Sequence, residues 1–184
     1  MTPKSFFIYN AKMLVEHLKS RHLDLELHRP VLDEANEVAT FYLWNLSGQL
    51  VGYQQYRPSG SKKNNNDPRE GKYFTYRKAP TVAVWGVESL HFTPDLLFLT
   101  EGVFDAARLT KHGVSAVAAL GNASTGDLKN WLSCLNRTVV AVCDNDKAGK
   151  ELAKFGHYVA FTDDHDLGDS SEEYVVDLLW KFGA

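Results

Sequence analysis

The chain has 184 residues, of which 44% are hydrophobic and 23% are charged, the balance expected of a soluble globular protein with one domain or two small ones. No apolar run approaches the roughly 20 residues that cross a membrane, and the N-terminus lacks the apolar stretch of a signal peptide, so no membrane partner is expected. The two cysteines, Cys134 and Cys143, are not spaced as a metal-binding knuckle, and we expect a reducing, cytoplasmic location.

The net charge of −3 conceals an uneven distribution of charge along the chain. Residues 51–80 carry seven Lys or Arg against two Asp or Glu, a local charge of +5, whereas residues 81–184 carry eight against fifteen. A basic segment beside an acidic one suggests a phosphate-binding surface next to a cation site. The alternative is the ordinary surface charge of a loop.

The N-terminal half is predicted to form a small α+β unit. Residues 10–21 have the apolar spacing of an amphipathic helix. Pro30 and the acidic residues after it are typical of a connection. Residues 39–44 and 50–56 have the composition of strands, and the turn signal at residues 45–48 predicts that they form a β-hairpin.

A basic loop and a further strand are expected after the hairpin. Residues 57–68 are polar, basic and punctuated by Gly and Pro, which predicts a surface loop. Residues 72–77, KYFTYR, could form a half-buried strand, or bases could stack on their rings. We expect Tyr73 and Tyr76 to be buried in a core.

The C-terminal half alternates strands and helices, which predicts a parallel sheet with helical cover. We therefore divide the chain into an α+β subdomain, residues 1–94, and an α/β domain, residues 95–184. The expected strands are residues 96–100, 114–120, 138–143 and 157–161, and the expected helices are residues 104–112, 125–135, 147–155 and 171–182.

One of these strands runs directly into acidic residues. Residues 139–143 are continuously apolar, as in a strand covered on both faces, and Asp144 and Asp146 follow at its carboxyl end, where open α/β sheets place ligands. Two carboxylates there would repel each other, which a bound cation resolves. Oxygen ligands without a His or Cys set favour Mg²⁺ or Mn²⁺. The alternative is that Asp144 only caps the next helix.

Glu101 holds the equivalent position after the strand at residues 96–100. Gly102 allows a sharp turn there. Because both strands are expected to be parallel and in one sheet, we predict that Glu101, Asp144 and Asp146 converge on one divalent cation. Asp105, one helical turn later, is expected nearby as a supporting group or additional ligand.

Together the two acidic motifs resemble those of Toprim domains. Residues 101–106, EGVFDA, are similar to the glutamate motif, and residues 144–149, DNDKAG, are similar to the DxD motif in the form found in bacterial and phage primases. Residues 118–122, AALGN, resemble the segment that such primases carry between the two motifs. The resemblance implies that the C-terminal domain has a Toprim fold, a parallel sheet flanked by helices.

These primases place a further acidic residue in a loop after the last strand. Asp166, which follows His165, is the best match, and Asp164 and Asp169 are the alternatives. An acidic loop before a helix also serves capping and the helix dipole, so the residues alone leave both roles open.

The N-terminal half resembles, more loosely, the segment that precedes Toprim in primases. There a hairpin leads to a basic Lys-Tyr element and then to a short strand end with Gly. The corresponding residues would be 52–57, 72–73 and 85–86. Primases usually have Asn and Ser after the Lys-Tyr pair, where this chain has Phe74 and Thr75.

The resemblance implies a DNA primase catalytic core, which makes short RNA primers on a single-stranded DNA template from nucleoside triphosphates. Mg²⁺ or Mn²⁺ would neutralise phosphate charge and align the displacement. The implied catalytic residues are Glu101, Asp144 and Asp146. The implied metal ligands are Glu101, Asp105, Asp144, Asp146 and Asp166. The residues expected to hold template and nucleotide phosphates are Arg57, Lys62, Lys63, Lys72 and Arg77.

The sequence shows no zinc-binding module and no Walker-type helicase motif. A separate zinc-binding module or a replicative helicase is therefore a candidate partner, and we expect either an excised core or a compact phage or plasmid primase. Two other functions stay open. One is a Toprim-family nuclease that uses the same metals with water as the nucleophile, and the other is a non-catalytic, nucleic-acid-binding replication accessory.

Overall fold

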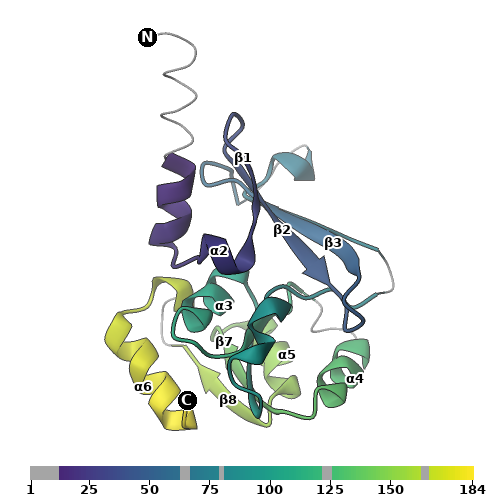
Figure 1. The fold of residues 1–184 in the computed structure, drawn as a ribbon, viewed down its shortest axis with the longest axis vertical. Coiled ribbons are helices and arrows are strands. Elements are labelled where there is room, and N and C mark those ends of the chain that lie inside the picture. The colour runs from purple at the N-terminus through teal and green to yellow at the C-terminus, as the bar shows by residue number, and fades with distance from the viewer. Residues whose placement is uncertain (1–12, 63–66, 79–80, 122–125, 163–165) are drawn as a thin grey trace.

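The strands of the protein form two four-stranded sheets, which we call sheet A and sheet B (Figure 1). The predicted fold class is confirmed, because a parallel sheet flanked by helices follows a small α+β part. Among the helices of the described residues, none is long and apolar enough to cross a membrane. The computed structural model describes residues 13–62, 67–78, 81–121, 126–162 and 166–184.

Sheet A is antiparallel and has the order β1 (Val31–Asp33), β2 (Val38–Trp44), β3 (Leu50–Tyr56) and β4 (Tyr73–Arg77). The predicted hairpin is β2 and β3. Strand β1 was not predicted and lies where a connection was expected. Three residues are too few to show an alternating pattern, and β1 is held by its pairing with β2.

Sheet B is parallel and has the order β6 (Ala116–Ala118), β5 (Leu96–Thr100), β7 (Thr138–Cys143) and β8 (Tyr158–Phe161). Strand β6 is shorter than the expected residues 114–120 at both ends, and at its C-terminal end Leu120 and Gly121 have positive φ angles of 49° and 76°. A residue with positive φ cannot continue a strand, so the chain turns there.

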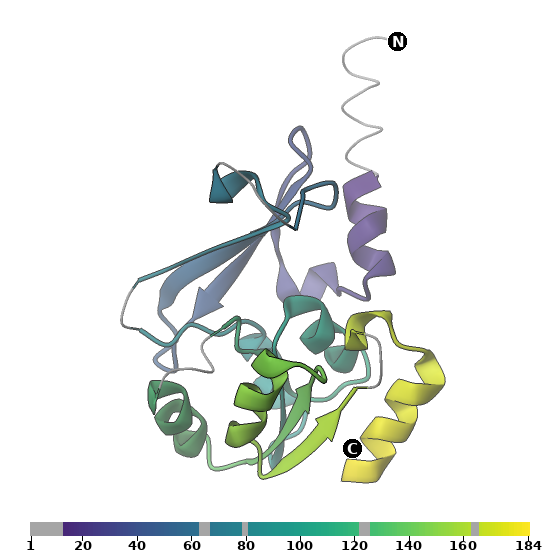
Figure 2. The same ribbon diagram turned by 180° about the vertical axis from the view of Figure 1, so that it is seen from behind.

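Helices cover both faces of sheet B (Figures 1 and 2). Phe98 and Val140 share one buried cluster with side chains of α3 and α6, whereas Leu97 and Val139 share another with α4 and α5. This double cover explains why the strands are apolar along their whole length. Residues 13–20 are also helical. The remaining helices are α2 (Leu25–His28), α3 (Val103–Thr110), α4 (Gly126–Cys134), α5 (Lys147–Leu152) and α6 (Glu172–Phe182).

The two sheets share a hydrophobic core. Leu18 of the N-terminal helix and Phe41 of β2 belong to the same buried cluster as Phe98 and the side chains of α3. The segment between the sheets touches both, since Val84 pairs with Trp44 and Trp85 pairs with Ala118. The expected division at residues 94 and 95 therefore falls within one continuous core and stays a prediction.

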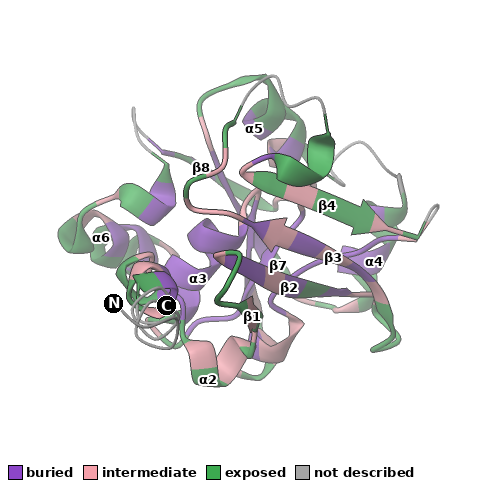
Figure 3. Ribbon diagram, turned by 90° about the horizontal axis from the view of Figure 1, so that it is seen from above, coloured by how far each residue is buried: buried purple, intermediate pink, exposed green. Residues whose placement is uncertain are grey.

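The expected burial of Tyr73 and Tyr76 is wrong. Their side chains are 42% and 53% exposed. Strand β4 lies at the edge of sheet A (Figure 3), and successive side chains point to opposite faces of a strand. One face of β4 borders a cavity and the other borders solvent, so neither provides a core.

Candidate active site

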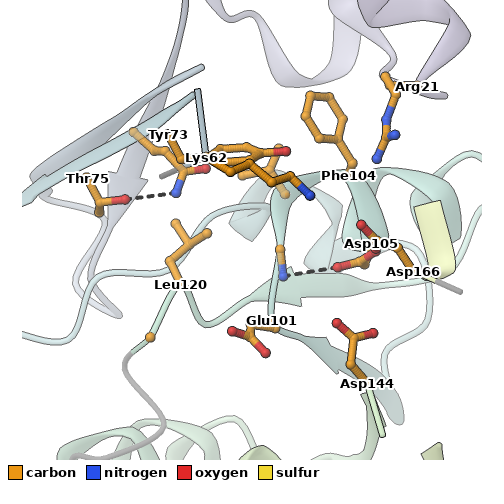
Figure 4. Close-up of a pocket in the computed structure, with 14 residues that line it drawn as sticks. Arg21, Lys62, Tyr73, Thr75, Glu101, Phe104, Asp105, Leu120, Asp144 and Asp166 are labelled. Atoms are coloured by element: carbon orange, nitrogen blue, oxygen red, sulfur yellow. Dashed lines mark hydrogen bonds between the residues drawn. The ribbon is translucent and has the colours of Figure 1, made fainter. Parts of the chain in front are cut away.

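Two neighbouring parallel strands bring acidic side chains to one edge of sheet B. Strand β5 pairs with β7 through Leu99 and Ala141, and Glu101 and Asp144 follow directly after these strands. A cavity of about 310 Å³ lies at this edge and is lined by Glu101, Asp144 and Asp166 together with other residues. Figure 4 shows the carboxyl groups of Glu101 and Asp144 on one side of this space.

The surroundings of the cavity disfavour the ionised forms of the Glu101 and Asp144 carboxylates that line it. Burial raises the pKa of Glu101, and the charges of Asp146 and Asp144 raise it further. Burial also raises the pKa of Asp144, and the charges of Asp166 and Asp146 raise it further. A hydrogen bond of 3.3 Å donated by the Thr162 hydroxyl lowers this pKa but does not offset the increase. A cation would relieve this repulsion.

The alternative in which Asp144 only caps the next helix is wrong. Asp146 is the residue that caps α5, because its side chain accepts a hydrogen bond of 2.8 Å from the Gly149 backbone. Asp146 is exposed and is not among the residues that line the cavity. The glycine is required by packing, since a Cβ atom on Gly149 would lie 1.9 Å from the Asp144 carbonyl oxygen.

Asp105 ties the glutamate motif to the loop that follows sheet B. Its buried carboxyl accepts hydrogen bonds from the Gly102 amide at 3.2 Å and from the Gly168 amide at 3.0 Å. Burial and a hydrogen bond with Asp166 raise the pKa of Asp105 well above its usual value, and the same hydrogen bond lowers the pKa of Asp166. The hydrogen bond therefore favours protonation of Asp105 over protonation of Asp166.

The structure also separates the three candidates for the further acidic residue. Asp166 lines the cavity. Asp169 instead forms an ion pair with Arg21, with 2.5 Å between Nη1 and Oδ1. Asp164 lies outside the described residues.

The opposite wall of the cavity comes from sheet A and from the N-terminal helix region. Tyr73 and Thr75 of β4 line it with Gln54 of β3, whose amide donates to the Thr75 hydroxyl at 2.8 Å. Arg21 lines it too, and its guanidinium lies 4.8 Å from the centroid of the Phe104 ring. The sequence did not identify Arg21, which is far from both motifs in the chain and is the last residue of the helix predicted at residues 10–21.

The basic residues chosen from the sequence are spread over a wider surface than the cavity. Lys62 lines the cavity, whereas Lys63 lies outside the described residues. Lys72 Nζ lies 5.9 Å from the Tyr56 ring centroid, in a neighbouring hollow. The structure places Arg57 beside Gln55, to which it donates at 3.2 Å, and Arg77 opposite Gly52 on β3. These last three do not line the cavity.

Within the described residues, no group of three or more His, Cys, Asp and Glu side chains is arranged to hold a metal ion. The chemistry of the donors nevertheless fits Mg²⁺ or Mn²⁺, because Glu101 and Asp144 offer hard oxygen ligands and repel each other. Mg²⁺ commonly uses one or two carboxylates and takes its other ligands from water and substrate phosphates. Two carboxylates beside an open cavity satisfy that requirement.

A family model of Toprim-like domains matches residues 98–162, which span β5 to β8. The chain is 25% identical over 150 residues to the DNA primase of Escherichia coli (strain K12), in an alignment that covers 79% of this chain and 24% of the primase. The chain thus spans about a quarter of the length of this curated relative.

Solved primase structures share the fold. The zinc-binding and RNA polymerase domains of the Aquifex aeolicus primase align with a TM-score of 0.64 and 17% identity, over 91% of this chain and 54% of that one. The DnaG primase catalytic domain bound to ssDNA aligns with a TM-score of 0.54 and 21% identity, over 80% of this chain and 49% of that one. The chain therefore carries a Toprim domain, and its fold resembles the catalytic cores of DNA primases.

Proposed function

We propose that this chain is the catalytic core of a primase, a DNA-directed RNA polymerase that makes short RNA primers on a single-stranded DNA template. The observation that carries the proposal is a cavity with two unlike walls. Carboxylates at the strand ends of sheet B form one wall, and Lys62, Arg21 and polar groups of sheet A form the other. Phosphoryl transfer needs this combination, because phosphate charge must be neutralised from several sides.

Glu101, Asp144 and Asp146 are the proposed catalytic acids, and Glu101 and Asp144 are the first candidates to hold Mg²⁺ or Mn²⁺. When bound, the ion neutralises phosphate charge and lowers the pKa of the attacking 3′-hydroxyl. Asp166 adds a charge on the same side. Asp105 holds the loop of Asp166 against α3, so we assign it a positioning role beside its expected role as a ligand.

Cationic side chains would hold the phosphates in this proposal. Lys62 and Arg21 face the cavity and are assigned to the nucleotide. The other basic residues selected from the sequence are assigned to the template strand. These are Arg57, Lys63, Lys72 and Arg77.

The similar proteins suggest the ligands and partners. One solved relative is a catalytic domain bound to ssDNA, one includes a zinc-binding domain, and one is a fragment of the bacteriophage T7 primase-helicase protein. We propose single-stranded DNA and nucleoside triphosphates as ligands, and a separate zinc-binding module or a replicative helicase as protein partners. We also propose a cytoplasmic location and a phage or plasmid origin.

A single incubation separates this function from its rivals. The chain is mixed with a single-stranded oligonucleotide, labelled ribonucleotides and Mg²⁺ or Mn²⁺, and the products are resolved by length. A primase gives short labelled oligomers that require template and cation. Shortened DNA without labelled product would identify a Toprim nuclease, and binding without either product would identify a replication accessory. The Asp144→Asn variant, purified in parallel, controls for contaminating polymerase.

A further inference from the structure

The face of sheet A that is turned away from the catalytic cavity carries a row of three tyrosines. Tyr42, Tyr53 and Tyr76 occupy directly paired positions on β2, β3 and β4. The ring centroids of Tyr53 and Tyr76 are 5.5 Å apart, and the side chains of Tyr42 and Tyr76 are 39% and 53% exposed. Among the described helices, none is drawn across β2 or β3 in Figure 3, and the short helical turn at Pro68–Glu70 lies against the start of β4.

Two more rings extend this row, which we call the tyrosine face. The Phe74 ring centroid lies 6.2 Å from that of Tyr53, and the Trp44 centroid lies 6.5 Å from that of Tyr42. Side chains alternate along β4, so Phe74 and Tyr76 point to this face while Tyr73 points to the cavity. A contiguous exposed aromatic surface of this kind marks a site of interaction.

Positive charge lies at both ends of the tyrosine face. Arg57 shares the face with Gln55, to which its Nη2 donates at 3.2 Å. Lys78 follows β4, and its backbone donates to the Val51 carbonyl at 2.8 Å. Among the described residues, neither cation forms an ion pair with a carboxylate. Both belong to the segment of residues 51–80, whose local charge is +5.

We propose that the tyrosine face binds single-stranded nucleic acid, with bases stacked on the tyrosines and phosphates held by Arg57 and Lys78. The proposal rests on the proposed function only in taking a nucleic acid strand as the ligand. It adds a second contact surface, on the far side of sheet A from the cavity. Every base has a π face, so stacking tolerates any sequence, whereas a duplex keeps its bases stacked on each other and unavailable.

The first test uses the unaltered chain. An oligonucleotide with 5-iodouracil at every third position is bound in EDTA and irradiated, and the crosslinked peptides are identified by mass spectrometry. We expect crosslinks at Tyr42, Tyr53 or Tyr76. Crosslinks confined to Tyr73 and its neighbours in the cavity would overturn the proposal.

The second test measures affinity by fluorescence anisotropy in EDTA, with a labelled 20-nucleotide oligothymidine. Tyr42→Ala and Tyr76→Ala should each weaken binding about 5- to 100-fold, the effect of losing one stacked base. Tyr76→Phe keeps the ring and should bind within about twofold of wild type. The matched control is Tyr158→Ala on β8, a side chain 57% exposed on the other sheet, which should leave affinity unchanged.

Salt dependence separates the two kinds of contact. Lys78→Ala should lower the slope of log affinity against log salt by about 0.7, the value for one phosphate contact on a single strand, whereas the tyrosine variants should leave the slope unchanged. Folded Tyr42→Ala and Tyr76→Ala variants with wild-type affinity would refute the proposal.

The outcome is independent of catalysis, because the binding assay contains no divalent cation. If the wild-type chain makes primers while the tyrosine variants bind normally, the inference fails alone. If binding depends on the tyrosines but no primers form, the proposed function fails alone.

Discussion

The two sheets carry their polar side chains in different places. Sheet B is covered by helices on both faces, so its strands are apolar and its acids lie beyond the strand ends, at Glu101 and Asp144. Among the described residues, the inner face of sheet A packs on the shared core while Tyr42 and Tyr76 on its outer face are exposed. The polar groups of this sheet, such as Thr75, therefore lie within a strand and not beyond its end. The position of an acid at a strand end is determined by the buried strand that precedes it. The side of the sheet to which a strand residue points is determined by how that strand pairs with its neighbours.

This difference predicts different responses to mutation. Substitutions at the strand ends of sheet B should abolish nucleotide incorporation, because only a few carboxylates are proposed to bind the metal ion there. Changes on the faces of sheet A should weaken binding by degrees, because many side chains share the contact. The following experiments compare the two.

The largest effect is expected at the end of β7. Asp144→Asn should reduce nucleotide incorporation by about 1000-fold or more, since several kcal/mol of charge stabilisation depend on the metal that it would hold. Its thermal stability in EDTA should stay equal or rise, because the pKa of Asp144 is raised and its charge is therefore unfavourable in the folded chain. Asp177→Asn on α6, the same substitution at an exposed acid away from the cavity, is the control. Incorporation at a wild-type rate in Asp144→Asn would exclude this site.

Asp105 should matter most for stability. Asp105→Ala leaves the Gly102 and Gly168 amides without their partner, which costs about 1–3 kcal/mol for the buried Gly168 amide and less for the half-buried Gly102 amide. Asp105→Asn should cost about half as much, because the amide oxygen can still accept one of the two hydrogen bonds, whereas the amide nitrogen cannot accept the other. Urea denaturation measures both. Equal losses in the two variants would contradict the positioning role.

Gly149→Ala decides between two opposed effects. Helix propensity alone predicts a gain of up to about 1 kcal/mol for alanine within α5. The new Cβ would meet the Asp144 carbonyl oxygen at 1.9 Å, a backbone atom that can yield only if the helix moves away from β7. We expect a net loss of about 1–2 kcal/mol in urea denaturation, with Lys150→Ala, on the exposed side of the same helix, as the control. A more stable Gly149→Ala would show that α5 can shift without cost.

Sheet B was predictable because its signals are local. A fully buried parallel strand is apolar throughout, and the residue after it is polar, so the positions of β5, β7, Glu101 and Asp144 follow from the sequence itself. The alternation of strands and helices predicts that the sheet is parallel, but the pairing of β5 with β7, which leaves β6 at the edge, is set by packing in the fold. What the sequence did not predict is which acid faces the cavity. Asp144 and Asp146 are both acids beyond one strand, and only the backbone turn shows that Asp146 caps α5.

Sheet A was less predictable because the surroundings of its side chains depend on parts of the chain that are distant in sequence. The hairpin of β2 and β3 was correct, but the three residues of β1 carry no periodic signal. The alternation of β4 could be seen, yet whether Tyr73 and Tyr76 meet a core, a cavity or solvent is set by distant parts of the chain. Arg21 also lines the cavity because of packing between distant parts of the chain, and no local sequence pattern predicts this position.

The smallest effect is a pH dependence at the junction of the N-terminal helix and sheet A. The His17 ring stacks on Tyr56 and its Nε2 lies 2.8 Å from the Tyr56 hydroxyl. Burial lowers the pKa of His17 below its ordinary value of 6.5, and the charges of Arg21 and Lys72 lower it further. As the pH falls, His17 is therefore protonated in the unfolded chain at a higher pH than in the folded chain. Its contribution to stability is present above about pH 6.5 and is lost as the pH falls toward the lower folded value.

His17→Gln isolates this contribution, because glutamine can still bond the Tyr56 hydroxyl but does not titrate. Melting temperatures are measured for both proteins at pH 7.5 and pH 5.5, and the drop should be larger for the wild type. The raised pKa values of Glu101 and Asp144 act in the opposite sense, stabilising the fold as the pH falls, but they are common to both proteins and cancel in the comparison. Equal drops would mean that His17 titrates alike in the folded and unfolded chains, and that the contact with Tyr56 does not exclude water from the ring.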